Sequence, residues 1–223
     1  MYAFEPSGVI ELAREIAAAN GFADRIEFVP KKSTETSLPE RVNTIVSDIR
    51  GILPFFGLSL VSIIDAREGF LAPNGRMIPS SDTLRIAGVQ APEFYQEQFG
   101  PWNDRPYDFD MSAARLRTIN SIRQCWVTAE QLLLEPRCLT TLNYMTLKQT
   151  GLDATVSWTV DRVSQAHGVV LWFDSVLADG VTLTNRPGAP RLIYKQAFFP
   201  WPSPLDVCPW GHRDRHGFCT TGG

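Results

Sequence analysis

The sequence predicts an α/β layer followed by an antiparallel β layer. Strand and helix patterns alternate through residues 1 to about 80, which is typical of a parallel sheet with crossover helices. After Pro79 helical periodicity is weak, and short strand patterns are separated by Gly, Pro and Asn turns, as in a β barrel or sandwich. With 44% hydrophobic and 20% charged residues, the 223-residue chain can bury a sizeable core, and global disorder is excluded.

The α/β layer is expected to begin with a strand at Tyr2–Phe4 and a helix after it. Ser7 is a suitable residue to cap that helix, and Gly21 is placed to end it. Helical spacing gives one apolar stripe, expected to face the sheet, made of Leu12, Ala13, Ile16 and Ala17.

The same alternation continues to about residue 80, and a further strand follows at Thr83–Val89. The pattern predicts a helix from Leu58 to Phe70, with Leu60, Ile63 and Ile64 inward, and a turn at Pro73–Gly75. The remaining strands of this part are expected at Ile26–Val29, Val42–Ser47, Arg76–Ile78 and Thr83–Val89.

The second part is expected to contain a loop-rich segment, residues 90–122, and then short strands. The aromatic residues of this segment are expected to pack between the layers, and the alternative is that they cradle a substrate: Phe94, Tyr95, Phe99, Trp102, Tyr107 and Phe109. His167 is expected on the barrel surface. Strands are expected at Leu139–Tyr144, Thr155–Val160 and Val169–Val176, with a turn at Asn185–Gly188.

Charge and composition limit the possible partners and the compartment. The net charge of −3 implies no broad basic surface, so nucleic acid is not expected as a partner, and Lys31 and Lys32 are expected to be merely solvated. A mildly acidic protein can still receive a cationic peptide. The longest uncharged stretch, Gly51–Ile64, is too short to cross a membrane. No secretory signal is recognisable, and four irregularly spaced cysteines suit reduced thiols in the cytoplasm.

Polar residues follow three of the predicted strands at what should be one edge of the sheet. Glu5 follows the first strand, as does the carboxylate that accepts ribose hydroxyls in nucleotide-binding α/β folds. Ser33 and Thr34 follow the next strand, where an adenine could lie, and Asp48 ends the third. The alternative for Glu5 alone is a solvated or helix-capping carboxylate.

At these residues the chain resembles the protein arginine methyltransferases. The likeness is collinear over residues 2–204 and is carried by YAFEPSGVIELAREIAAANG, RIEFVPKKSTETSLPERVNTIVSD, DAREGFLAPNGRMIPSSDTLRIAG, YDFDMSAAR, AHGVVLWFDSVLADG and NRPGAPRLIYKQAFFPW. It implies a Rossmann-like cofactor domain followed by a β barrel, and S-adenosylmethionine as cofactor. We expect residues 1–80 and 81–204 to form these two domains and residues 205–223 to form an irregular tail.

The resemblance also implies site residues. Glu5 would bind the ribose of the cofactor, and Ser33 and Thr34 would flank its adenine. Asp48 matches the first of two glutamates that grip a guanidinium, so it is the expected catalytic carboxylate. Tyr194 lies in the segment that closes the active site on the substrate side. A protein or peptide substrate and a homodimer are further expectations from the resemblance.

Three departures from the family pattern indicate a divergent and N-terminally truncated member. The family's first strand and glycine-rich turn are missing before Tyr2, so a partial sheet is expected, with a gap between the strands that carry Glu5 and Asp48. Gly57 replaces the second glutamate, and Arg50 adds a positive charge that would repel a cationic substrate or pair with Asp48. Tyr194 and the two residues before it replace a polar triplet that contains a histidine.

Three functions are compatible with this sequence. The first is methyl transfer from S-adenosylmethionine to a nitrogen nucleophile, and the second is an inactive fragment or pseudoenzyme that binds protein. The third is zinc binding by the tail, where Cys208, His212, His216 and Cys219 are spaced C-x3-H-x3-H-x2-C. That spacing is not a standard zinc finger, so no metal is expected.

Overall fold

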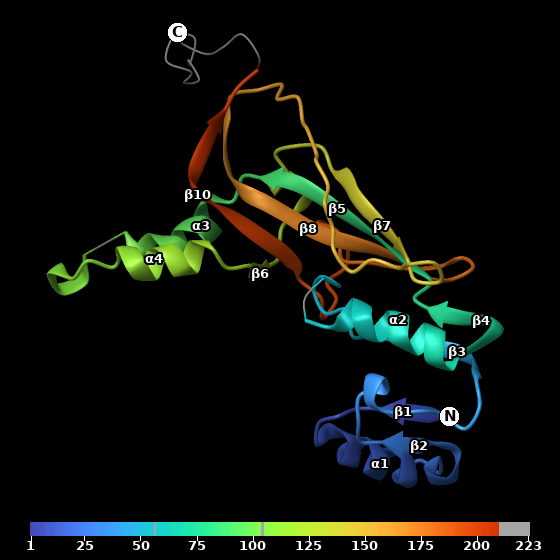
Figure 1. Ribbon diagram of the computed structural model, residues 1–223. Helices are drawn as coiled ribbons and strands as arrows, with labels where there is room; N and C mark the ends of the chain where they lie inside the picture. The colour runs from blue at the N-terminus through green and yellow to red at the C-terminus, as the bar shows by residue number, and fades with distance from the viewer. Residues whose placement is uncertain (56, 104, 210–223) are drawn as a thin grey trace, which may run out of the picture.

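The computed structural model describes residues 1–55, 57–103 and 105–209. The described strands form two separate pairs of parallel strands and one six-stranded sheet, called here the large sheet. Figure 1 shows the first pair at the blue end of the chain and the large sheet at the opposite end, with the second pair between them. The predicted order of a parallel α/β part followed by an antiparallel part is therefore confirmed.

The first parallel pair consists of β1 (Tyr2–Phe4) and β2 (Glu27–Val29), joined through helix α1 (Val9–Ala19). Gly21 follows the helix with a φ of +74°, in the role predicted for it. The predicted apolar stripe is largely wrong, because Leu12, Ala13 and Ile16 are exposed, whereas Ala17 is buried together with Ile10. A sheet only two strands wide leaves most of the helix face without a surface to cover it.

The second parallel pair consists of β3 (Val42–Val46) and β4 (Leu71–Ile78), joined through helix α2 (Ser59–Phe70). The predicted turn at Pro73–Gly75 lies inside β4 as a bulge, where Asn74 has a φ of +65° and the register with β3 shifts. Leu60 and Ile63 of α2 are buried as predicted, whereas Ile64 is only partly buried. The contacts of this helix form a buried cluster of Leu60, Ile63, Leu71, Met77, Leu142 and Tyr144.

The two parallel pairs are connected by side chains and not by strand pairing. Within the described residues, the free edges of β1 and β3 have no partner strand. The ring of Phe4 in β1 stacks on that of Phe70 in α2, with centroids 5.5 Å apart and planes 8° from parallel. The first pair is therefore attached to the rest of the molecule through the end of α2.

The large sheet has the strand order β6-β10-β8-β5-β7, with β9 added beside β8, and its pairings are antiparallel. Its strands are β5 (Ser81–Val89), β6 (Arg123–Cys125), β7 (Arg137–Asn143), β8 (Ser164–Ala178), β9 (Val181–Thr184) and β10 (Gln196–Val207). The predicted closed barrel is wrong for the described residues, since the outer strands β6 and β7 do not pair with each other. The strand expected at Thr155–Val160 is absent, since these residues have no regular secondary structure.

The segment expected to be loop-rich contains two short helices, α3 (Pro92–Phe99) and α4 (Ser112–Ile119). Helices of eight residues span barely two turns, which is too few for a periodic pattern to be recognised. Tyr95 and Phe99 pack in a buried cluster, as expected for the aromatic residues of this segment. Tyr107 does not, since it is 93% exposed in a short 3₁₀ turn, η4 (Pro106–Asp108).

Strand β8 is buried on both faces. Val170 and Trp172 belong to the cluster under α3, whereas Leu171 and Phe173 belong to a second cluster that contains Leu53. Successive side chains of a strand point to opposite faces, so β8 is shared between two cores.

His167 in β8 is buried, and the prediction that it lies on the surface is wrong. Its ring packs edge-on against Tyr95 of α3, with centroids 5.5 Å apart, because the helix that the sequence did not reveal covers this end of the strand. This burial lowers the pKa of the imidazole.

None of the helices in the described part of the chain is long and apolar enough to cross a membrane.

Candidate functional site

The residues predicted to bind a nucleotide follow the parallel strands β1 and β2. Glu5 comes directly after β1, and Ser33 and Thr34 lie in a 3₁₀ turn, η2 (Ser33–Glu35), that follows β2. Because the two strands are parallel, these side chains lie at the same edge of the pair. Ser33 is half-buried and Thr34 is exposed, and η2 lies against α2.

Glu5 is an ionised carboxylate at the start of α1. Its Oε1 accepts a hydrogen bond of 2.8 Å from the backbone N–H of Ser7. Hydrogen bonds from the side chain and backbone of Ser7 hold the pKa of Glu5 below its ordinary value. Ser7 lies outside α1 and the N-cap of the helix is Gly8, so Glu5 does not cap the helix. Its place at the strand edge keeps it a candidate for ribose.

Asp48 lies at the end of the second parallel pair and contacts the large sheet. The N–H of Ser47 bonds to the carbonyl of Ile78 at 2.9 Å, which continues the β3–β4 pairing up to Asp48. The hydroxyl of Tyr194, just before β10, lies 2.5 Å from both Asp48 oxygens and donates to them. The structure therefore brings together the predicted catalytic and substrate-side residues from opposite ends of the sequence.

Tyr194 is a hydrogen-bond donor over the whole physiological pH range. Burial, followed by the hydrogen bond and charge of Asp48, raises the pKa of its phenol to about 12. Its ring packs edge-on against Phe173 of β8, with centroids 5.5 Å apart.

Arg50 does not pair with Asp48, so that expectation is wrong. The loop turns the Arg50 side chain into the large sheet, where its Nη1 lies 2.5 Å from Oδ1 of Asp82 and 2.5 Å from Oγ of Ser175. Arg50 is 5% exposed and Asp82 is fully buried. The other oxygen of Asp82 accepts a 2.6 Å hydrogen bond from Tyr144, and Ser175 also donates to Asp82.

Sequence reasoning missed this buried network. Its signals were weak: Arg50 stands only two residues after Asp48, and Asp82 lies near the start of a strand of mixed polarity. The pairing of β5 with β8 places Asp82 opposite Ser175, and the packing of the loop on these strands brings Arg50 to both.

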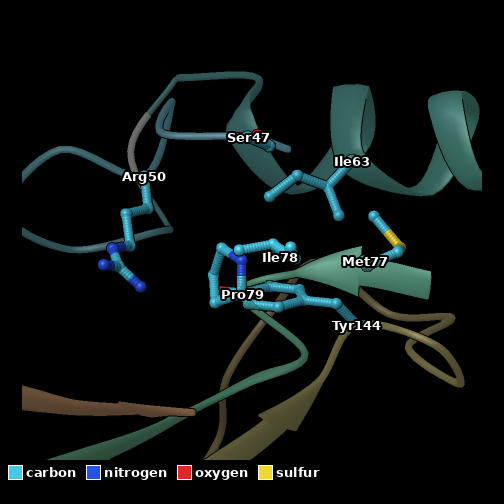
Figure 2. A pocket seen from close by; sticks show the side chains of 7 residues that line it. All are labelled: Ser47, Arg50, Ile63, Met77, Ile78, Pro79 and Tyr144. Atoms are coloured by element: carbon cyan, nitrogen blue, oxygen red, sulfur yellow. The ribbon is translucent and has the colours of Figure 1, made fainter. Parts of the chain in front are cut away.

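A small cavity lies where the loop, α2, β4 and the large sheet meet. Figure 2 shows Ile63 reaching from the helix toward Met77 on the strand, with Tyr144 below them and Arg50 to one side. The cavity measures about 10 Å³, which holds at most one water molecule. Its complete lining is Ser47, Arg50, Ile63, Met77, Ile78, Pro79 and Tyr144.

A larger hollow of about 470 Å³ lies at the amino ends of β1 and β2, where Tyr2 and Glu27 line it. Glu5 lies at the other end of β1, so this hollow is not at the predicted nucleotide edge. The residues of the predicted site therefore lie around the carboxyl ends of the parallel strands, and neither of these two cavities coincides with them.

Gly57, where the family pattern has its second glutamate, offers no side chain. Its φ of +63° is a conformation that residues with a Cβ adopt only with strain. Asp48 is therefore the one carboxylate of the 47–58 loop.

The described residues contain no cluster of three His, Cys, Asp or Glu side chains that could hold a metal ion. Of the proposed tail ligands, Cys208 is buried, and His212, His216 and Cys219 lie outside the described residues.

Comparison with known proteins gives consistent matches. A sequence model of the arginine methyltransferase oligomerization subdomain matches residues 80–209. Protein arginine N-methyltransferase 1 of Chlamydomonas reinhardtii is 27% identical over 205 residues, covering 89% of this chain and 59% of the relative. Its namesake from Saccharomyces cerevisiae is 26% identical over 213 residues, covering 90% and 60%. The chain thus spans about 60% of the length of these relatives.

Solved structures match the fold. A Trypanosoma brucei PRMT1 enzyme–prozyme heterotetrameric complex with AdoHcy superposes with a TM-score of 0.80 at 24% identity, covering 93% of this chain and 67% of the other. Arabidopsis thaliana protein arginine methyltransferase 10 superposes with a TM-score of 0.76 at 18% identity, covering 93% and 69%.

Proposed function

Because the chain belongs to the protein arginine methyltransferase family, we propose that it acts in S-adenosylmethionine-dependent methyl transfer to a nitrogen nucleophile. The observation that carries the proposal is the contact between Asp48 and Tyr194, which joins the end of a parallel strand to the large sheet. In this proposal residues 1–80 form the cofactor-side domain and 81–204 the substrate-side domain, with a tail at 205–223.

The residues at the nucleotide edge fit the adenosine part of the cofactor. Glu5 is ionised, half-buried and placed after β1, which suits a ribose diol, and Ser33 lies beside it after the paired strand. Thr34 is exposed and would lie against the face of the adenine. When bound, S-adenosylmethionine supplies an electrophilic methyl group on its sulfonium.

Asp48 would orient the acceptor. One carboxylate oxygen would accept a hydrogen bond from an N–H of the acceptor, which fixes the direction of the nitrogen lone pair. As positive charge develops on that nitrogen, the carboxylate stabilises it and is placed to take its proton. Tyr194 bonds to both Asp48 oxygens, so its hydroxyl would release one of them and keep the other.

A protein or peptide is the proposed acceptor, since relatives are named as protein arginine methyltransferases. Gly57 leaves Asp48 without a second carboxylate in its loop, so the acceptor would be held at one point. A guanidinium gains most from two-point binding, and a simpler amine nitrogen would suit this site better.

We further propose a cytoplasmic homodimer. The matching sequence model describes an oligomerization subdomain. Exposed apolar side chains gather around α4 at Tyr107, Phe109 and Leu116, where a second copy would cover them.

A second candidate is a pseudoenzyme that binds protein. Two observations favour it: Gly57 removes one acceptor carboxylate, and the strands that carry Glu5 and Asp48 lie in separate sheets within the described residues. In this case the large sheet would carry the function, and Asp48 with Tyr194 would be structural.

Titration calorimetry with S-adenosylmethionine separates the two candidates. The first predicts heat of binding for the wild-type chain and for Glu11→Gln, which changes an exposed carboxylate on α1 that pairs with Arg14. Binding should weaken at least tenfold in Glu5→Gln. Asp48→Asn should bind the cofactor normally and lose methyl transfer. If millimolar cofactor gives no heat with the wild-type chain, the pseudoenzyme candidate remains.

A further inference from the structure

We propose that Arg50 is a positioning residue that holds Asp48 and Tyr194 against each other from inside the large sheet. The geometric part of this inference stands alone, and its importance for the acceptor rests on the proposed function of Asp48. The Arg50 side chain is directed away from Asp48 and into the large sheet, where it pairs with Asp82.

The guanidinium of Arg50 is anchored on two strands. Nη1 binds Asp82 of β5 and Ser175 of β8, each at 2.5 Å. Asp82 is itself held by Tyr144. A buried charge bonded in this way is expensive to move, because any displacement would leave Asp82 without its counter-ion.

The same guanidinium supports the aromatic pair that presents the phenol. Its Cζ lies 4.3 Å from the ring centroid of Phe173 and 5.9 Å from that of Tyr194. The two rings also pack edge-on against each other. Arg50 therefore forms one wall of the slot that holds the Tyr194 ring.

Arg50 also limits the position of Asp48 through the backbone. Only one residue, Ile49, separates them, so their Cα atoms are at most about 7 Å apart. The carbonyl of Ile49 accepts a 2.8 Å hydrogen bond from Ser59 at the start of α2. The loop is thus fixed immediately after Asp48, and both members of the Asp48–Tyr194 pair depend on Arg50.

The change in the pKa of Tyr194 when Arg50 is removed has one sign if Arg50 acts only through its charge and the opposite sign if Arg50 positions the pair. The charge of Arg50 by itself lowers the pKa of Tyr194. If Arg50 contributes only its charge, removing it raises that pKa further. If Arg50 positions the pair, its loss frees the phenol from Asp48 and from burial, and the pKa falls toward the ordinary value of about 10.

The experiment is ¹⁹F NMR titration of the full chain labelled with 3-fluorotyrosine. Tyr194→Phe identifies the resonance of Tyr194, and free 3-fluorotyrosine added to each sample gives the reference. In wild type, Tyr194 should titrate well above the ordinary phenol pKa of about 10. Arg50→Met should lower the pKa of Tyr194 by at least about one unit, and Arg50→Lys should give a pKa between those of wild type and Arg50→Met because it keeps a cation near Asp82.

An unchanged Tyr95 resonance would show that each variant is folded, since Tyr95 lies in α3 and is not part of the Arg50 network. If Arg50→Met does not fold, Ser175→Ala removes one of the two bonds to Arg50, and a smaller shift of the same sign is expected. An unchanged or raised Tyr194 pKa in the folded variants would overturn the proposal. No cofactor is needed, so a failure here is distinct from a failure of methyl transfer.

Discussion

Replacing Asp82 with alanine is predicted to destabilise the protein by about 4 kcal/mol, although Asp82 contacts no proposed ligand. The substitution leaves the Arg50 guanidinium buried without its counter-ion. It also removes the acceptor of the Tyr144 hydroxyl and a partner of Ser175.

The magnitude follows from burial. The Arg50 and Asp82 side chains are 4% and 0% exposed, and breaking such a pair by removing one partner costs about 3–5 kcal/mol. The ion pair of Arg85 with Asp174 links the same two strands, but each side chain is 39% exposed, and such pairs contribute about 0–1 kcal/mol. Asp174→Ala is therefore the matched control.

Urea unfolding is a suitable assay. With a slope of about 2 kcal/mol per molar urea, Asp82→Ala should lower the midpoint by about 2 M, and Asp174→Ala by less than about 0.5 M. Sulfate can be added equally to all samples if the variant is too unstable to measure. Equal losses in the two variants would refute the reasoning from burial.

A double substitution tests the cause. Arg50→Met combined with Asp82→Leu removes both charges, so it should cost clearly less than Asp82→Ala alone, since apolar replacement of a whole buried pair is often neutral. A double variant less stable than Asp82→Ala would show that packing, and not the stranded charge, sets the cost.

Two further predictions follow from buried positions of β8. Gly168→Ala would place a methyl group against the Phe199 carbonyl and the Phe198 ring, so we expect the free energy of unfolding, measured with urea, to fall by about 1–3 kcal/mol. The control Gly151→Ala adds its methyl group in open space and should change this free energy by less than about 0.5 kcal/mol. Equal effects of the two substitutions would contradict this reasoning. Because burial lowers the pKa of His167, the unfolded chain binds its proton first, and stability should decline as the pH falls from about 6.5 through the folded pKa. With His212 and His216 replaced by Gln in both proteins, melting temperatures from pH 7.5 to 5.5 should depend less on pH in His167→Phe, and parallel curves would argue against this role.

The sequence was sufficient for the parts of the fold that repeat a local pattern. Sequence patterns predicted the strands around Phe28 and Ile45 and the inward positions of Leu60 and Ile63 in α2. These patterns, alternation and helical spacing, depend only on residues that are close together in the sequence. The helices α3 and α4 were missed because eight residues carry too little periodicity. Exposure of Leu12 and Ile16 was also unpredictable, since it depends on how wide a sheet α1 can cover.

The candidate site, too, was predicted only in part. Resemblance pointed to Asp48 and Tyr194, and the structure places them in contact. The partner of Arg50 was wrong, because Asp48 is near in sequence whereas Asp82 is brought near only by the packing of the loop on β5 and β8. The proposed nucleotide roles of Glu5, Ser33 and Thr34 stay predictions.

The burial of both faces of strand β8 has a consequence for mutagenesis. Trp172 belongs to the core under α3, and its neighbour Phe173 belongs to the core that supports Arg50. A saturation scan along this strand would therefore sort into two interleaved sets of variants, one that disturbs the core under α3 and one that disturbs the core that supports Arg50. Adjacent codons would then probe the two cores separately.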